Sequence, residues 1–308
     1  MEKEKVSPER FIGMQAGNAE LQSRLLDLIR GGLVELDAAT PQYFEEFAAR
    51  MVDAQLGSIG KRIRSWATFR EIYPNEWHEK LLGELGSLYL FSKAFQNFAT
   101  LPETLQDELL AQAGVTTRTS DLFQQTGIQD DWLVLGQVKT PEPNNLTSRR
   151  TWLVGKKSQK IVLSLEYTFG AADFTTLWLN GMVYSGEAVY YPSAYPLRVA
   201  FKSVDLASNF VEVIGYQTIE SFLRDYSEAI AQNPWLPQFP VLLSSVMPVF
   251  LENKFFLVDS EKKCVHTAGE VCSPWALIAL SGGRPITVFG EWDGQALKIL
   301  NAFSGEKN

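Results

Sequence analysis

The chain has 308 residues, of which 45% are hydrophobic and 12% are aromatic. This is enough apolar surface for one large domain or two smaller ones, which excludes disorder as the main state. With 28 basic and 36 acidic residues the net charge is −8, which argues against a protein wrapped in nucleic acid, because that role needs an extended basic face. Two cysteines are too few for a disulfide scaffold and suit a reducing cytosol.

The sequence predicts neither a signal peptide nor a membrane-spanning helix. The first ten residues mix acidic and basic side chains and no apolar segment follows them, so we expect no signal peptide. The longest apolar stretch, residues 241–251, contains Ser244, Ser245 and Pro248 and is shorter than the roughly 20 residues of a membrane helix. The expected compartment is the cytoplasm.

Residues 1–127 show helical periodicity. The first predicted helix ends at Gly31-Gly32, because glycine is typical just after a helix. A second begins after Thr40-Pro41, and Gly57 and Gly60 are expected to interrupt it before a helical pattern resumes at residues 61–69. Its apolar stripe is Phe44, Phe47, Ala48 and Met51. Further helices are predicted at residues 75–98, 103–114 and 119–125.

From residue 131 the pattern alternates, as it does in strands. One helix is expected within this half, at residues 218–232. Asn180-Gly181 and Asp293-Gly294 are predicted two-residue hairpin turns. The predicted strands are residues 132–138, 151–155, 161–169, 176–184, 187–191, 197–202, 255–258, 275–280, 286–292 and 297–303.

These patterns predict an α+β fold. A helical N-terminal half precedes a β-rich, mostly antiparallel C-terminal half with one embedded helix. We place the domain boundary between a helical domain, residues 1–127, and a β-rich domain, residues 128–308.

The sequence lacks the common catalytic signatures. No serine has glycine at both −2 and +2, as a nucleophile elbow requires. Residues 155–158 resemble part of a Walker A loop, but Arg150 stands where its first glycine belongs and Lys157 where its Ser or Thr belongs. His78 starts a zincin-like string in which Leu82 replaces the second histidine. The sequence therefore leans away from an enzyme and identifies no catalytic or cofactor-binding residue.

One cluster resembles a metal site. Cys264, His266 and Cys272 are chemically suitable zinc ligands, but a closed structural site needs four. The fourth would have to be a carboxylate such as Asp259 or Glu270, which is uncommon in structural sites. Zinc is thus conceivable without being supported, and we predict no metal or cofactor.

A basic segment between residues 149 and 160 suggests nucleic-acid binding. Its five cations have no acidic residue between them, and a basic hairpin beside aromatic side chains can hold phosphate and stack bases. The alternative is the ordinary polar edge of a hairpin, which the negative total charge favours. The candidate residues are Arg149, Arg150, Lys156, Lys157 and Lys160.

A second candidate site surrounds Trp292. Glu291 and Asp293 are two residues apart, and paired carboxylates can perform acid–base work or hold a hard cation. The alternative is structural: Asp293 accepts turn hydrogen bonds, Gly294 takes a positive φ and Trp292 packs. The sequence favours this second interpretation.

Several short strings, in order, resemble bacterial SWIM zinc finger family proteins in the region after the finger. The clearest is FAARMVDAQ at residues 47–55, preceded by LDLIRGGL at residues 26–33. The likeness extends from about residue 20 to residue 303. The other strings lie at residues 84–90, 148–155, 190–192, 196–198, 280–283 and 290–294.

The chain departs from that family at its start. The family's N-terminal Cys-x-Cys…Cys-x-His zinc site, thought to serve DNA or protein binding, is missing, because residues 1–20 contain neither Cys nor His. No zinc ligand is therefore carried over. Either the finger is encoded by a neighbouring reading frame, or this member has lost it.

The leading hypothesis is a non-catalytic interaction or scaffold module whose partner is a protein, with a separately encoded SWIM finger chain as one candidate. The first alternative is nucleic-acid binding through residues 149–160. The second is an enzyme that uses carboxylates such as Glu291 and Asp293.

Overall fold

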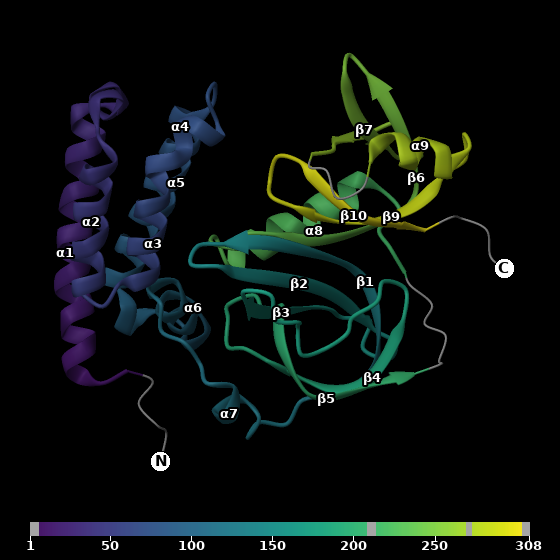
Figure 1. Ribbon diagram of the computed structural model, residues 1–308, viewed down its shortest axis with the longest axis horizontal. Coiled ribbons are helices and arrows are strands. Elements are labelled where there is room, and N and C mark those ends of the chain that lie inside the picture. Colours follow the sequence, from purple (N-terminus) through teal and green to yellow (C-terminus); the bar gives the residue numbers. More distant parts are fainter. Residues whose placement is uncertain (1–5, 208–213, 269–272, 304–308) are drawn as a thin grey trace. The chain divides into compact units, whose positions relative to one another are not determined.

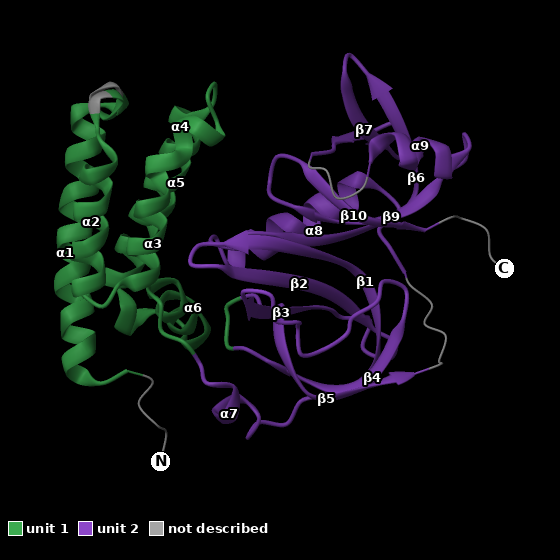
Figure 2. Cartoon of the chain, viewed as in Figure 1, with its two compact units in different colours: residues 1–116, 192–194 green, residues 117–191, 195–308 purple. Residues whose placement is uncertain are grey.

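The computed structural model describes residues 6–207, 214–268 and 273–303. The chain forms two compact units, residues 1–116 with 192–194, and residues 117–191 with 195–308 (Figure 2). Within the described ranges, no helix is both long enough and apolar enough to cross a membrane.

Unit 1 is helical (Figure 1). The predicted stripe of α2 is confirmed, because Phe44, Phe47, Ala48 and Met51 are its buried residues. Gly32 follows α1 with a φ of +83°, as expected for a glycine that ends a helix. The elements are α1 (Pro8–Gly31), η1 (Leu33–Ala38), α2 (Pro41–Asp53), α3 (Gly57–Ser65), η2 (Trp66–Thr68), α4 (Phe69–Ile72), α5 (Trp77–Gln96), η3 (Phe98–Thr100) and α6 (Glu103–Ala113).

The expected interruption exists, but it lies at residues 54–56, between α2 and α3, and not at Gly57 and Gly60, which both belong to α3. A Cβ on Gly60 would be 2.8 Å from the Ala48 carbonyl oxygen and 2.9 Å from Val52 Cγ2. The missing side chain therefore lets α3 approach α2 closely, and the gain in packing outweighs the poor helix propensity of glycine.

Unit 2 contains a closed five-stranded barrel in the order β1-β2-β3-β5-β4. Its neighbours are antiparallel except for β3 and β5, which run parallel. Trp132, Leu153, Val162 and Trp178 belong to its buried interior cluster. The elements are α7 (Thr119–Leu122), β1 (Ile128–Glu142), β2 (Leu146–Gly155), β3 (Ile161–Phe169), β4 (Val183–Tyr190) and β5 (Arg198–Ala207).

The predicted strand at residues 176–184 is largely wrong, because β4 begins at Val183 and also includes most of the separate strand expected at 187–191. Residues 176–182 instead form an irregular segment that ends in a turn at Gly181, whose φ is +79°. Gly181 N–H donates to the Val134 carbonyl. Trp178 is apolar and packs into the barrel interior, which is why this irregular segment looked like a strand in the sequence.

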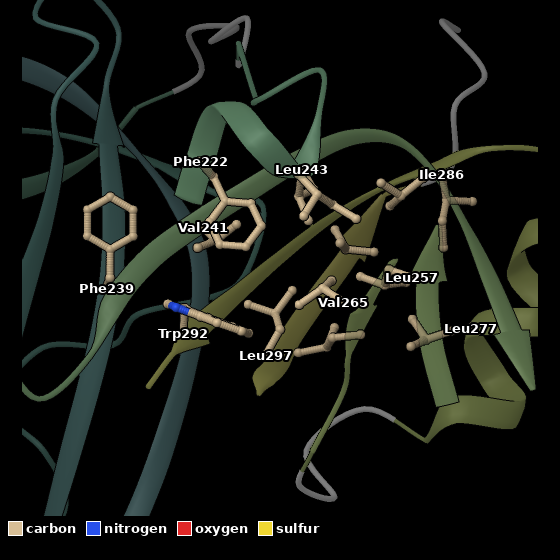
Figure 3. Packing of buried hydrophobic residues seen from close by; sticks show 14 of the residues in the cluster. Phe222, Phe239, Val241, Leu243, Leu257, Val265, Leu277, Ile286, Trp292 and Leu297 are labelled. Atoms are coloured by element: carbon tan, nitrogen blue, oxygen red, sulfur yellow. The ribbon is translucent and has the colours of Figure 1, made fainter. Parts of the chain in front are cut away.

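The rest of unit 2 is a second sheet in the order β10-β9-β6-β7-β8. Helix α8 is the predicted embedded helix, and Thr218 caps it by accepting a hydrogen bond from Ser221 N–H. Phe222 from α8 packs with Val241, Trp292 and Leu297 of the sheet in one buried cluster (Figure 3). The elements are α8 (Ile219–Gln232), β6 (Phe239–Leu251), β7 (Lys254–Val258), β8 (Cys264–His266), α9 (Pro274–Ser281), β9 (Ile286–Trp292) and β10 (Leu297–Phe303).

Two local predictions in this sheet need correction. Residues 275–280, expected as a strand, form helix α9, with Pro274 in its first turn and Gly282 left-handed at its end. The hairpin at Asp293-Gly294 exists, but four residues, 293–296, connect β9 to β10. The predicted fold class is confirmed: a helical N-terminal region precedes a β-rich, mostly antiparallel region with an embedded helix.

Candidate functional site

The structure joins the two candidate sites through Arg150 and Glu291. Arg150 Nε donates to Glu291 Oε1 at 2.9 Å, and Arg150 Nη2 donates to Oε2 at 3.1 Å. Trp152 Nε1 also donates to Glu291 Oε1, at 2.9 Å. The Glu291 side chain is only 3% exposed, so its negative charge is held inside the protein by this arginine and this indole.

Strand alternation explains this meeting. Arg150, Trp152 and Val154 lie on one face of β2, because side chains alternate along a strand. Trp152 and Val154 belong to a buried cluster with Phe289 of β9 and Leu300 of β10. The barrel face that carries Arg150 is therefore packed against the second sheet in this region.

Arg149 points to the opposite face of β2 and is also buried. Its Nη2 donates to Glu166 Oε2 at 2.6 Å and to the Thr176 carbonyl at 2.5 Å. Its guanidinium carbon lies 4.3 Å from the centre of the Phe174 ring. Trp178 Nε1 donates to the same Glu166 oxygen at 2.9 Å. Arg149 is thus part of the barrel's own hydrogen-bond network.

The three lysines lie in or beside the turn between β2 and β3. Lys156, Lys157 and Lys160 are exposed, and Lys160 Nζ lies 5.8 Å from the centre of the Tyr190 ring. They are not grouped with the two arginines, whose guanidinium groups are bound within the protein. The structure therefore divides the predicted basic segment into buried arginines and exposed lysines.

Asp130 organises this turn from the adjacent strand. Its carboxylate accepts the N–H groups of Lys157 at 3.0 Å and Ser158 at 2.8 Å. Burial alone would raise the pKa of Asp130, but these hydrogen bonds and that of Asp131 N–H together hold the pKa below its ordinary value. Asp130 was not predicted, because nothing local in the sequence indicates which turn it faces.

Trp292 and Asp293 have different surroundings from the Glu291 carboxylate. Trp292 is buried and packs edge-on against Phe222 of α8, with ring centres 5.6 Å apart. Asp293 is exposed, and its Oδ1 accepts the N–H groups of Gln295 at 2.8 Å and Ala296 at 2.9 Å. The two carboxylates therefore do not share one site: one binds Arg150 and the other shapes a turn.

The metal-like cluster is divided as well. Cys264 and His266 lie on β8, whereas Cys272 and Glu270 lie outside the described residues. Asp259 accepts Ile219 N–H at 2.8 Å through Oδ2 and Lys263 N–H at 2.9 Å through Oδ1. Across the part of the chain that the structure describes, no group of three or more His, Cys, Asp or Glu side chains is placed to hold a metal ion.

The helical unit has a recognisable relative. Residues 9–113 match the family model of the SWIM-associated four-helix bundle domain. This match confirms the resemblance for the SWIM-associated region. No curated protein and no solved structure matches the chain.

Beyond the SWIM-associated bundle, unit 2 has an aromatic pocket that the sequence did not predict. We call it the tyrosine pocket, with a volume of about 520 Å³. The one feature of the sequence that could have indicated this pocket is the cluster of Tyr and Pro at residues 190–196. This cluster overlaps two of the strings that carry the family resemblance, residues 190–192 and 196–198. Its principal lining residues are Lys160, Tyr190, Tyr195, Pro196, Tyr216 and Phe239.

Proposed function

We propose that the chain is a non-catalytic interaction module whose partner is a protein. The observation that carries this proposal is the pairing of Arg150 with Glu291. It supports a structural role for Arg150, one of the five cations of the nucleic-acid hypothesis, and for Glu291, the buried carboxylate of the enzyme hypothesis. Neither group has to be kept for a ligand, because each is satisfied within the fold.

An exposed aromatic cluster on unit 2 supports a protein partner. Phe250, Phe255 and Trp275 have ring centres 4.6 to 5.1 Å apart, and Trp275 is 60% exposed. Leu251 beside them at the tip of the β6–β7 hairpin is also exposed. Exposed apolar groups gathered in this way are typical of protein contact surfaces.

The SWIM-associated bundle makes a separately encoded SWIM finger chain the first partner to test. On this proposal both proteins act in the bacterial cytoplasm. The bundle would then supply the region that normally follows the finger, and unit 2 would provide further binding surface.

The test is affinity capture from the native host with the full chain as bait. An unrelated acidic protein of similar size serves as the control bait. We expect at least one protein to be enriched over the control and to bind the purified chain directly. If no protein is enriched over the control, or none of those captured binds the purified chain, the proposed function is wrong.

Nucleic-acid binding is the second candidate, and one observation favours it. The barrel order, with β3 and β5 parallel, is the connectivity of OB folds, many of which bind oligonucleotides on strands 2 and 3. On that face Tyr167 and Phe169 of β3 are 55% and 66% exposed. The rest of the face carries Arg150 and Trp152, which the second sheet engages through Glu291, so little cationic surface accompanies the rings.

Gel shifts with a labelled oligothymidylate at about 50 mM salt test this candidate. Nucleic-acid binding would appear as a shift that Phe169→Ala weakens and that higher salt removes. Lys157→Gln is the matched charge variant, and it should reduce the salt dependence. We expect no shift under these conditions.

A further inference from the structure

The tyrosine pocket is built within unit 2 from four stretches of the chain. Lys160 follows the β2–β3 turn, Tyr190 ends β4, and Tyr195 and Pro196 belong to the next loop. Tyr216 precedes α8, and Phe239 begins β6. Its described lining therefore combines four aromatic rings with two prolines, two aliphatic side chains, Gln159 and Lys160.

These walls are fixed before any ligand arrives. Tyr216 N–H donates to the Leu242 carbonyl at 2.7 Å, and the Tyr216 carbonyl accepts Ser244 N–H at 2.9 Å. The Tyr216 hydroxyl donates to Asp225 Oδ2 at 3.1 Å. The Tyr195 ring packs on Phe239 with centres 6.3 Å apart. A preformed pocket of this kind loses little conformational entropy on binding.

Charged side chains of both signs contact tyrosines of the pocket. Asp225 is bonded to Tyr216, while Lys160 lies over Tyr190. Burial first, and then the negative charges of Asp225 and Glu228, raise the pKa of Tyr195. Asp225 and Glu228 lie three residues apart on α8 and so share one of its faces, and Asp225 binds the Tyr216 hydroxyl at the pocket. Two carboxylates on this face of α8 favour a cationic group beside them.

Three ligand classes can be compared by their needs. A small polar metabolite needs several converging polar groups, but the Tyr216 hydroxyl is already used by Asp225. A nucleic acid needs several cations along its backbone, and Lys160 is the sole cation among the pocket's described lining residues. A proline-rich segment needs an aromatic-lined groove, which this pocket provides.

We propose that the tyrosine pocket binds a proline-rich peptide segment in the polyproline II conformation, with a basic residue of the peptide beside Asp225 and Glu228 of α8. Pyrrolidine rings pack on the half-buried rings of Tyr190 and Tyr195, while the buried Phe239 supports Tyr195 from within. The pocket volume of about 520 Å³ lies within the roughly 300–1,000 Å³ of ordinary ligand sites. This inference deepens the proposed function, because it gives the protein partner a recognisable segment.

Fluorescence anisotropy with the full chain tests the inference. The probes are labelled ten-residue proline-rich peptides with one arginine at the first or the last position. Matched peptides carry glutamate for arginine, or alanine for every proline. We expect saturable binding of at least one arginine peptide, binding about two- to five-fold weaker with glutamate, and at least about ten-fold weaker without proline.

Two variant pairs locate the binding. Tyr195→Ala should weaken it at least about ten-fold, whereas Tyr167→Ala, which removes an exposed ring of β3 outside the pocket, should not. Glu228→Lys should weaken binding of the arginine peptide and strengthen that of the glutamate peptide, whereas Glu252→Lys should change neither. If Tyr195→Ala lowers the melting temperature of the protein, the location of peptide binding is decided by Glu228→Lys and its control Glu252→Lys, which both change exposed side chains.

Several results would overturn the inference. The first is that no proline-rich peptide binds saturably up to about 1 mM. The second is that peptide binding is left unchanged by both Tyr195→Ala and Glu228→Lys. The third is that an oligothymidylate binds the chain and Tyr195→Ala abolishes that binding. A captured host protein that binds the chain and its Tyr195→Ala variant equally, together with no peptide binding, refutes the pocket while the interaction role stands. Failure to capture any protein refutes the interaction role itself.

Discussion

Two ion pairs, one in each unit, differ in how far water reaches them. In unit 1, Arg64 and Glu45 pair at 2.6 Å with 47% of each side chain exposed. In unit 2, Arg150 and Glu291 pair at 2.9 Å with 19% and 3% exposed. The first pair joins neighbouring helices and the second joins strands that are 141 residues apart in sequence.

The difference in exposure predicts how much stability is lost when one partner of each pair is removed. Around an exposed pair, water replaces either partner, so little stability depends on it. Around a buried pair, removal of one partner leaves the other charge poorly solvated, which is strongly destabilising. We therefore expect Arg150 and Glu291 to stabilise the fold through their pairing, although both were candidates for ligand binding in the sequence.

The largest effect is expected from Glu291→Gln. The change leaves the partly buried Arg150 guanidinium without its counter-charge and should lower the free energy of unfolding by about 3 kcal/mol. Urea unfolding followed by tryptophan fluorescence measures this. Glu45→Gln in unit 1 is the matched control, and its midpoint should be indistinguishable from that of the wild type. Equal effects of the two changes would remove the contrast between the two pairs.

Trp152→Phe should have the next largest effect. It keeps an aromatic ring against Phe289 but removes the indole N–H that donates to Glu291 Oε1. The loss of a buried hydrogen bond to a charged group should cost about 2 kcal/mol. Trp77→Phe, a change at a partly exposed ring of α5, provides the control in the same unfolding experiment. An unchanged midpoint for Trp152→Phe would show that the indole bond contributes nothing.

Asp130→Asn tests the turn that carries the lysines and should cost about 1–2 kcal/mol at neutral pH. Because the folded pKa of Asp130 lies below its ordinary value of 3.8, the carboxylate's contribution is present above that value. It is lost as the pH falls through the folded pKa. Wild type and variant should therefore converge in stability as the pH falls below 3.8 and through the folded pKa. A difference that stays constant from pH 7 to pH 2 would contradict this role.

The smallest effect compares two glycines of unit 1. Gly60→Ala places a methyl group against Ala48 and Val52, so overpacking should outweigh the gain in helix propensity and cost about 1 kcal/mol. Gly83→Ala in α5 meets open space and should stabilise by up to about 1 kcal/mol. Thermal unfolding distinguishes opposite signs. Stabilisation by both changes would mean that α2 and α3 do not approach closely.

Local patterns in the sequence predicted much of the helical unit. The stripe from Phe44 to Met51 is a property of one helix, so the sequence alone sufficed. At residues 275–280 the same reasoning failed, because an apolar run has no period that distinguishes a short helix from a strand. The signals that decide it, Pro274 and Gly282, flank the run.

The candidate site could be predicted in its parts but not in its assembly. Arg150, Trp152 and Glu291 all lie in strings noticed in the sequence. Their meeting depends on how β2 packs against β9, and strand packing over such a separation leaves no local pattern. The tyrosine pocket was missed for the same reason, since Tyr190, Tyr216 and Phe239 come from separate elements.

A double-mutant cycle on Arg150 and Glu291 tests the central claim most directly. The free energy of unfolding is measured for wild type, Arg150→Gln, Glu291→Gln and the double variant. If the two groups serve each other, the double variant is less destabilised than the sum of the single changes, by at least about 1 kcal/mol. Additive and small effects, together with weaker oligonucleotide binding in Arg150→Gln, would show that Arg150 is kept for a ligand instead.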